Sequence, residues 1–393
     1  MSDKKSVVIT SANRTAVGSL GGSLKNIAGD ELGSTVISEA IKKSQLKKEE
    51  IDEVIMGQVL TGGTGQNPAR QAAIKSGIPK EKPAYVVNQV CGSGVRAIAS
   101  GYQSIKTGDA RIIVAGGQEN MSLAPHAIHL RDGKKLGDAK IVDTMIKDGL
   151  WDAFHNYHMG ITAENVATKF QITRDEQDKF ALNSQKKALE AQKQRKFIDE
   201  IINFKIISKK AEINFCKDEH PRDGISLEAL KRLKPVFKKD GSVTAGNASG
   251  INDGAAAVIL MTEEEAEKRK IQSLVKIKSW ASCGVDPALM GTGPIPSSKK
   301  AMDLAGWKTN DIDLFEINEA FAAQSIAVIK TLSIPEEKVN VNGGAIALGH
   351  PIGASGARII VTLIHEMIKR DVHKGLATLC IGGGMGIAMC VER

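Results

Sequence analysis

Short apolar runs rich in β-branched residues recur along the chain between glycines, and they predict buried strands. They cover residues 7–10, 54–59, 85–90 and 111–114, and later residues 255–261, 274–283, 312–317, 339–341 and 375–380. Stretches with helical periodicity lie between some of these runs, at residues 30–43, 94–106 and 356–369. Strands and helices in alternation predict an α/β fold with mostly parallel sheets.

Two distant segments share a pattern of small residues followed by Ser-Gly-x-Arg. Residues 91–96 read CGSGVR, and residues 353–358 read GASGAR. Each segment opens a predicted helix, and each helix is followed by an apolar strand that runs into a glycine pair, Gly116-Gly117 or Gly382-Gly383. Because the same order of small residues, helix, strand and glycine pair occurs twice, the sequence predicts that the chain contains two duplicated halves.

The middle of the chain, residues 123–247, carries more charge and fewer strand-like runs than either end. Thr173 and Glu176 have the spacing of a capping box, which predicts a helix over about residues 174–195. That helix is so polar that we expect it to lie on the surface. We interpret the whole stretch as an insertion between the two halves.

Most of the excess positive charge falls within this insertion. The chain has 53 Lys and Arg against 45 Asp and Glu, a formal net charge of +8, and residues 169–240 alone hold 18 basic and 12 acidic residues. A solvated surface and a region that faces an anionic ligand are both open interpretations. Nucleic acid is not expected, because no aromatic residues alternate with the basic ones to stack on bases.

Length and cysteine usage narrow the class of protein further. The 393 residues have room for two or three domains. The 5 cysteines include no C-x-x-C pair, so we expect free thiols rather than disulfides or a metal site. No apolar run reaches the ~18 residues of a membrane span, and the first residues do not resemble a signal peptide. These features predict a reduced, cytoplasmic protein that does not bind a membrane.

Cys91 and His350 are the first candidates for chemistry. Cys91 lies between an apolar strand and the glycine-rich start of a helix, where the helix dipole favours the thiolate and lowers the thiol pKa. The alternative is a buried core cysteine. His350 lies in a loop with several glycines and a proline, which predicts a fixed, partly exposed imidazole. A histidine that accepts the thiol proton would make Cys91 a nucleophile.

Cys380 and Asn318 are the second pair of candidates. Cys380 ends a predicted strand and leads into a glycine-rich loop whose N–H groups could form an oxyanion hole. If the halves are related, pseudo-symmetry would bring it near Cys91 as a base; otherwise it is a buried thiol. Asn318 follows a strand, where it could hold a water molecule, donate to an oxyanion or cap a helix. No cofactor-binding motif is present, so we expect no cofactor and no metal.

Four motifs taken together are typical of one family. They are Cys91-Gly92-Ser93-Gly94, Asn318-Glu319-Ala320-Phe321, Gly349-His350-Pro351 and Cys380-Ile381-Gly382. With them, essentially the whole chain resembles the thiolases, and among these the short-chain acetyl-CoA acetyltransferases of the cytosolic type. The resemblance implies an α/β thiolase fold of two duplicated halves in a five-layer αβαβα core. Residues 1–117 and 250–270 would form one half, residues 271–393 the other, and residues 118–249 a loop domain over the site.

The resemblance also implies a role for each candidate. Cys91, activated by His350, would take an acetyl group from acetyl-CoA, and Cys380 would remove the α-proton of a second acetyl-CoA. His350 and a water molecule on Asn318 would stabilise the enolate oxygen, while the N–H groups of Cys91 and Gly382 would form a second oxyanion hole. The reaction is the reversible Claisen condensation of two acetyl-CoA to acetoacetyl-CoA and CoA.

Substrate contacts and partners follow from the same resemblance. The residues expected to contact the CoA thioester are Arg222, Ser226, Lys234, Ser249, His158, Met159 and Phe321. The implied partners are acetyl-CoA, acetoacetyl-CoA and CoA, together with further copies in a homotetramer held by a loop at residues 131–143. A cytoplasmic role in lipid metabolism, including the mevalonate pathway, is implied as well. Two other functions stay open: a thiolase-fold lipid-binding protein without activity, and a decarboxylating ketoacyl synthase.

Overall fold

The computed structural model describes residues 6–207 and 212–393. The first residues of the chain and two lysines of the basic stretch, Lys209 and Lys210, lie outside the described residues. One large sheet has the strand order β14-β15-β16-β13-β1-β12-β5-β3-β4, with β2 paired to β12. Its strands are β1 (Val7–Arg14), β2 (Gly18–Ser19), β3 (Glu53–Gly57), β4 (Ala84–Val87), β5 (Ile112–Asn120), β12 (Asn252–Thr262), β13 (Val275–Gly284), β14 (Leu314–Ile317), β15 (Lys374–Ile381) and β16 (Met385–Glu392).

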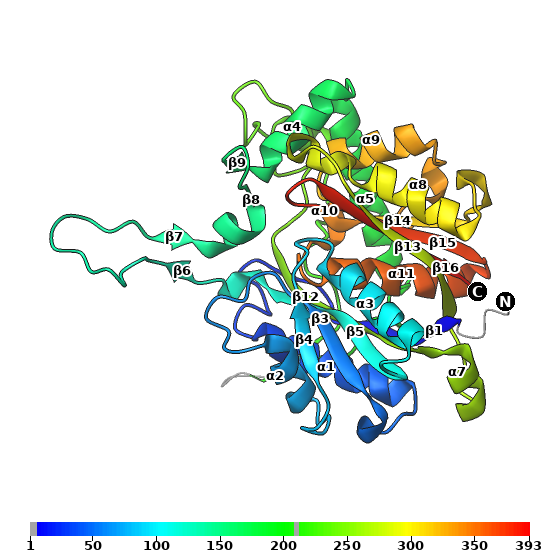
Figure 1. Ribbon diagram of the computed structural model, residues 1–393. Coiled ribbons are helices and arrows are strands. Elements are labelled where there is room, and N and C mark those ends of the chain that lie inside the picture. Colours follow the sequence, from blue (N-terminus) through cyan, green and yellow to red (C-terminus); the bar gives the residue numbers. More distant parts are fainter. Residues whose placement is uncertain (1–5, 208–211) are drawn as a thin grey trace.

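Helices cover both faces of the sheet and fill the insertion (Figure 1). They are α1 (Gly29–Lys43), α2 (Pro68–Lys75), α3 (Ser93–Thr107), α4 (Met159–Lys169), α5 (Arg174–Lys193), α6 (Leu227–Lys231), α7 (Glu263–Arg269), α8 (Pro294–Ala305), α9 (Ala322–Leu332), α10 (Ala345–Leu348) and α11 (Ser355–Arg370). Within the described part of the chain, none of them has the length and apolar character needed to cross a membrane.

The sheet is mixed, so the predicted mostly parallel arrangement is wrong. Only β3 with β4, β3 with β5, and β14 with β15 run parallel. The central pairs, such as β1 with β12 and β15 with β16, are antiparallel. One reason is the turn after β15, where Gly383 and Gly384 have positive φ values of 87° and 82°. This turn reverses the chain into β16, a strand that the hydrophobic pattern alone did not identify.

The other predicted elements are present with shifted ends, apart from one. The run at residues 339–341 makes an isolated bridge from Val339 to Phe315 and does not form a strand. Asn340 ties this run to β14, because its N–H donates to the carbonyl oxygen of Phe315 at 2.9 Å and its Oδ1 accepts from the N–H of Ile317 at 2.8 Å. Val339 packs into the apolar cluster on the outer face of that part of the sheet.

The two halves form five layers. Strands β1 to β5 and β12 belong to one half and β13 to β16 to the other, and they join through β1 and β13 at the pairs Val8–Lys276 and Ile9–Val275. α1 and α2 cover the outer face of the first half, α8 and α9 that of the second, and α3 and α11 pack together between the halves (Figure 1). Along β5, Ile113 faces the central helices while Ile112 faces outward. The five-layer thiolase fold is therefore confirmed.

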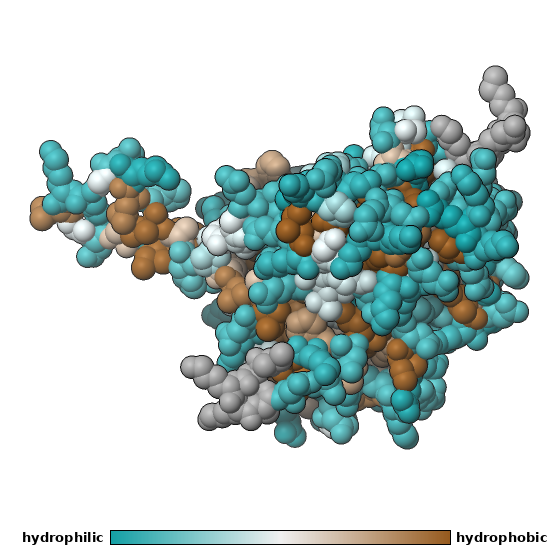
Figure 2. Space-filling model, turned by 90° about the horizontal axis from the view of Figure 1, so that it is seen from below, coloured by the Kyte–Doolittle hydropathy of each residue, from teal (hydrophilic) through white to brown (hydrophobic). Residues whose placement is uncertain are grey.

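The insertion between β5 and β12 contains α4, α5, α6 and three short hairpins. The hairpins pair β6 (His126–Ala127) with β7 (Val142–Asp143), β8 (Trp151–Asp152) with β9 (Tyr157–His158), and β10 (Phe204–Ile207) with β11 (Glu212–Phe215). The first of these is the base of an arm that projects from the body of the molecule (Figure 1). Leu136 on the arm is 92% exposed, and Figure 2 shows apolar side chains gathered along it.

Helix α5 begins at the predicted capping box. Thr173 N donates to Glu176 Oε2 at 2.7 Å, and Glu176 N donates to Thr173 Oγ1 at 3.2 Å. The prediction of a surface helix is wrong for one of its faces, because four polar side chains on that face are buried: Gln177, Asp178, Ser184 and Gln185. They are tolerated there because they find protein partners; Ser184 Oγ, for example, donates to Glu319 at 2.6 Å.

Candidate active site

Cys91 lies on a sharp turn between β4 and α3. Val90, the residue before it, has a φ of +45°, which is unusual for a β-branched side chain. Ser93 holds this turn: its Oγ donates to the carbonyl oxygen of Val90 at 2.6 Å and accepts from the N–H of Gln89 at 2.9 Å. The N-cap of α3 is Gly92, so Cys91 directly precedes the helix, where the sequence pattern placed it.

The electrostatics of Cys91 differ from the expectation. Burial raises the pKa of its thiol to about 11, although the N–H groups of Gly382 and of Cys91 itself act in the opposite direction. The predicted lowering of the pKa is therefore wrong, because desolvation outweighs the favourable N–H groups. At pH 7 such a thiol is ionised in about one molecule in 10⁴, so acylation needs a base that accepts its proton.

His350 is the candidate for that base. Its Nδ1 lies 2.5 Å from Ser355 Oγ, and that hydroxyl donates to the carbonyl oxygen of Pro351 at 2.9 Å. A hydroxyl has only one proton to donate; when that proton is directed to Pro351, the oxygen can only accept from Nδ1, and in this tautomer Nε2 is unprotonated and can accept a proton. His350 is 5% exposed rather than partly exposed as predicted, and burial lowers its pKa to about 3. The imidazole is therefore neutral at physiological pH.

Asn318 lies beside His350. Its Nδ2 is 3.4 Å from His350 Nε2, and its buried Oδ1 has no partner among the described residues. A buried amide with an unused oxygen is well suited to hold a water molecule. The alternative of a helix cap is wrong, because α9 begins at Ala322 with Phe321 as its N-cap.

The two candidate thiols lie in the same site. Cys380 is fully buried at the end of β15, and burial together with the negative charge of a Cys91 thiolate raises its pKa well above the usual range. The segments that carry the two thiols pack against each other: a Cβ on Gly92 would lie 2.4 Å from Ile381 Cδ1, and a Cβ on Gly382 would lie 3.2 Å from Val90 Cγ1. The turn that follows Cys380 brings the N–H of Gly382 to Cys91. The structure thus gathers Cys91, His350, Asn318, Cys380 and Gly382 from four separate loops.

A cavity of about 590 Å³ leads to this group of residues. Among the residues that line it are His350, Arg222, Ser249, His158 and Phe321. It also reaches Met121, Leu150 and Ile352, and these belong to the apolar cluster against which Cys91 packs.

Three of the expected substrate contacts do not line this cavity. Ser226 instead caps α6, where its Oγ accepts from the N–H of Ala229 at 3.2 Å. Lys234 is exposed outside the cavity lining. Met159 lies behind the wall, in an apolar cluster with Phe321 and Cys380.

Aromatic side chains close one side of the cavity. His158 stacks on Phe237 with ring centroids 4.6 Å apart, and Phe237 meets Phe321 edge to face at 6.4 Å. Burial lowers the pKa of His158, which favours the neutral ring. Phe237 was not among the predicted site residues, although aromatic residues make up only 4% of the chain and each is therefore informative.

Asn252 and Ser355 are further site residues that were not predicted from the sequence. Asn252 Oδ1 accepts from the backbone N–H of His350 at 2.9 Å and so fixes the histidine loop. For Ser355 a signal existed, because it is the serine of the repeated Ser-Gly-x-Arg pattern. Asn252 stands in no motif, and its role depends on a contact between residues 98 positions apart.

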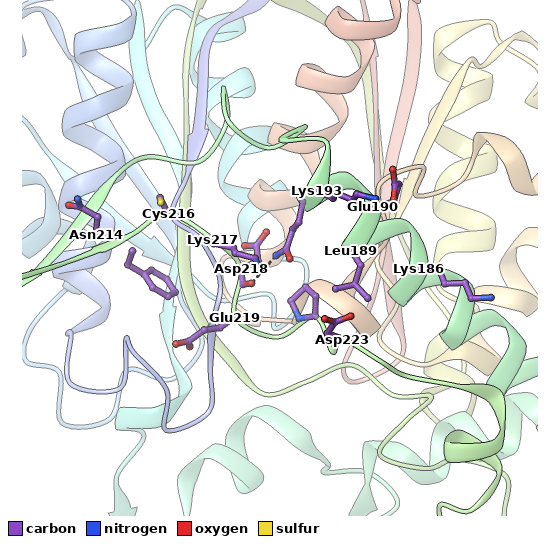
Figure 3. Close-up of a pocket in the computed structure, with 13 residues that line it drawn as sticks. Lys186, Leu189, Glu190, Lys193, Asn214, Cys216, Lys217, Asp218, Glu219 and Asp223 are labelled. Carbon is purple, nitrogen blue, oxygen red and sulfur yellow. Dashed lines mark hydrogen bonds between the residues drawn. The ribbon is translucent and has the colours of Figure 1, made fainter.

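A larger depression of about 890 Å³ lies between α5 and the segment that includes β11 and the residues after it, and it adjoins the smaller cavity at Glu219 and Pro221 (Figure 3). Its lining mixes lysines such as Lys186 and Lys193 with acidic residues such as Glu190 and Asp223. It contains none of the candidate catalytic residues. Across the described residues, no group of three or more His, Cys, Asp or Glu side chains could hold a metal ion. We therefore place the chemistry in the smaller cavity.

Comparison with known proteins identifies the family. Residues 7–264 match the thiolase N-terminal domain, and residues 271–393 match the thiolase C-terminal domain. The chain is 61% identical over 388 residues to the acetyl-CoA acetyltransferase of Rhizobium meliloti (strain 1021), with 99% of each chain covered. It is 54% identical over 389 residues to the cytosolic acetyl-CoA acetyltransferase of Mus musculus, with 98% of each covered. The crystal structure of the Bacillus anthracis acetyl-CoA acetyltransferase superimposes with a TM-score of 0.97 at 46% identity, with 99% of both chains covered. The chain belongs to the thiolase family.

Proposed function

We propose that this protein is an acetyl-CoA C-acetyltransferase, which condenses two acetyl-CoA to acetoacetyl-CoA and CoA and catalyses the reverse thiolysis. One observation carries the proposal: a neutral His350 with a free Nε2 shares a buried site with two cysteine thiols at the inner end of a substrate-sized cavity. The names of the relatives at 54% to 61% identity support the same reaction.

The first half-reaction loads an acetyl group onto Cys91. His350 Nε2 accepts the thiol proton, and the thiolate attacks the thioester carbonyl of acetyl-CoA. The carbonyl oxygen of the thioester becomes negative in the tetrahedral intermediate. The N–H groups of Cys91 and Gly382 lie at the attacking sulfur, where they can donate to this oxygen. CoA then leaves as its thiolate and takes the proton of Cys380. The products of this step are acetyl-Cys91, free CoA, a Cys380 thiolate and a protonated His350.

The second half-reaction forms the carbon–carbon bond. The Cys380 thiolate removes a proton from the methyl group of a second acetyl-CoA, and the enolate attacks the acetyl carbon on Cys91. Ser355 keeps the Nδ1 proton of His350 in place, so Nε2 can donate to the enolate oxygen only while it retains the proton taken from Cys91. A water molecule on Asn318 would supply a second donor. When Cys91 is expelled, it takes its proton back from His350.

Incubation with acetyl-CoA alone tests this function. We expect release of free CoA, formation of acetoacetyl-CoA, and an acetyl adduct that peptide mapping places on Cys91. A lipid-binding protein that only shares the fold would release no CoA. A decarboxylating synthase would need a substrate that loses carbon dioxide. An adduct on Cys216 or Cys283 in place of Cys91 would contradict the assignment.

We also propose that the protein works in the cytoplasm as a homotetramer and supplies lipid metabolism, including the mevalonate pathway. The projecting arm supports the assembly, because it exposes several large apolar side chains that a second copy could cover: Ile128, Leu130, Leu136 and Ile141. Light scattering on the purified protein tests it. Replacing Leu136 and Ile141 by serine should convert a tetramer into smaller species.

A further inference from the structure

Glu119 is a buried acid near the catalytic group to which the mechanism assigns no role. It lies near the end of β5 and is 1% exposed. Its carboxylate accepts three backbone hydrogen bonds, from Val59 N at 3.0 Å, from Leu60 N at 3.1 Å and from Gly353 N at 2.9 Å. These donors belong to two separate loops.

One of these loops carries His350, and the other packs beside Cys91. Gly353 follows His350 by three residues, in the same loop. Val59 and Leu60 pack with Ile352 in the apolar cluster that Cys91 adjoins. The carboxylate therefore ties the loop of the base to the wall beside the nucleophile.

The two loops are closely packed where Glu119 joins them. A Cβ added to Gly353 would lie 2.6 Å from Glu119 Oε2 and 2.8 Å from the Cα of Gln58. The loops therefore pack so closely that position 353 has no room for a side chain. Burial raises the pKa of Glu119 to about 7, while the three N–H groups favour its ionised form.

We propose that Glu119 is a positioning residue for acyl transfer: its carboxylate holds the loop of His350 against the wall beside Cys91 and so sets the separation between base and nucleophile. The proposal rests on the function proposed above. A carboxylate suits this task because one group can accept from N–H donors on both loops at once.

Replacing Glu119 by glutamine tests the proposal. The amide keeps the shape of the side chain but offers only one acceptor oxygen, so at least one of the three N–H groups loses its partner. We expect kcat for thiolysis of acetoacetyl-CoA to fall at least tenfold, with KM within twofold of the original. If the glutamine variant does not fold, Glu119→Asp shortens the reach by one methylene and should show the same split.

Asp52→Asn is the matched control. Asp52 also accepts two backbone N–H groups, from Arg111 at 2.9 Å and Ile112 at 3.1 Å, but at the opposite end of β5. Removing its charge should leave both kcat and KM within twofold.

A double-variant cycle separates positioning from a general structural effect and does not require turnover. Cys91 is alkylated with iodoacetamide at pH 7, and the rate is followed by mass spectrometry. We expect Glu119→Gln to slow alkylation at least threefold in the original protein, but less than 1.5-fold in a His350→Asn background.

Equal slowing in both backgrounds, or faster alkylation of the glutamine variant, would overturn the proposal. Faster alkylation would mean that Glu119 acts only through its negative charge, which raises the pKa of Cys91. Failure of the proposed function has a different signature: the original protein would form no acetoacetyl-CoA, whatever the alkylation rates.

Discussion

Gly94 on α3 and Gly356 on α11 meet in a reciprocal contact between the two halves. A Cβ on Gly94 would lie 2.4 Å from the backbone N of Ala357, and a Cβ on Gly356 would lie 2.5 Å from the backbone N of Val95. The two glycines occupy the same position of the repeated Ser-Gly-x-Arg pattern. Their close approach brings the starts of both helices together.

The serines of the repeat support the two catalytic loops in corresponding ways. Ser93 donates to the carbonyl of Val90 and holds the turn before Cys91, whereas Ser355 donates to the carbonyl of Pro351 and holds His350. The nucleophile and its base are thus presented by equivalent helix starts in the two halves.

Gly94→Ala should destabilise the protein and impair catalysis. The added methyl group has no room against backbone atoms, so we expect a loss of about 1–3 kcal/mol, typical of overpacking. Gly62→Ala is the control, because its Cβ would meet Pro125 Cγ at an ordinary 3.5 Å. The melting temperatures of the two variants are compared, and that of Gly94→Ala should be the lower one. Equal melting temperatures would show that the helices can separate at no cost.

Serine variants of the two active-site cysteines should fail differently. Cys91→Ser should lose both acetyl uptake and condensation, because an alcohol is a far weaker nucleophile than a thiolate. Cys380→Ser should still take up acetyl on Cys91, since CoA can leave as a thiolate, and should then stall before carbon–carbon bond formation. A positioned base contributes about 10²–10⁴-fold, so condensation should fall by that order.

Acetyl uptake by intact mass is measured beside acetoacetyl-CoA formation. Condensation by Cys380→Ser near the original rate would contradict this division of roles.

Ser355→Ala should lower kcat about tenfold or more with little change in KM. Without the hydroxyl, Nδ1 loses its acceptor and the tautomer with Nε2 unprotonated is no longer enforced. Ser297→Ala is a matched control: Ser297 Oγ also donates to the carbonyl four residues earlier, that of Gly293, at 3.0 Å, but it faces no histidine. Steady-state thiolysis rates distinguish the two. Equal losses in both variants would assign Ser355 to helix stability alone.

Arg222→Ala should raise KM for CoA substrates by about two- to fivefold while kcat changes little. Arg222 lines the cavity but is exposed, and exposed charge contacts contribute about 0–1 kcal/mol. Lys234→Ala should change KM less than twofold, because Lys234 lies outside the cavity lining. Raising the salt concentration should reduce the rise in KM that Arg222→Ala causes. A larger effect for Lys234 than for Arg222 would mean that CoA takes a different path across the surface.

Stability should depend on pH through His350. Its pKa is about 3 in the folded protein and about 6.5 in the unfolded chain, so the unfolded state binds more protons between these values. The free energy of unfolding should therefore decrease as pH falls from 6.5 toward 3, by up to about 1.4 kcal/mol per pH unit from this group. Urea unfolding at pH 6.5, 5.5 and 4.5 should show a shallower dependence for His350→Asn. If the free energy of unfolding changed with pH equally in both proteins, His350 would not be the buried neutral imidazole described here.

Much of the site could be predicted from local pattern. Cys91 at a helix start, His350 in a glycine-rich loop, Cys380 at a strand end and Asn318 after a strand all lie where the sequence placed them. These positions follow from neighbouring residues, since glycines, turns and apolar runs act over a few residues. Most strands and helices were predictable for the same reason.

Strand direction and protonation were not predictable in this way. The hairpin from β15 to β16 made the sheet mixed, and burial gave Cys91 a pKa of about 11 and His350 a pKa of about 3. Both depend on which distant segments pack around a residue. The pattern of residues within one segment does not show which distant segments will pack around it.

The repeat, most of the elements and the four catalytic candidates follow from residues that are neighbours along the chain. How these candidates interact depends on the tertiary structure. Glu119 contacts loops 60 and 234 positions away, and Asn252 contacts His350 across 98 positions. The physical reason is that hydrogen bonding and desolvation depend on spatial neighbours, and folding brings those neighbours together from segments far apart in the chain.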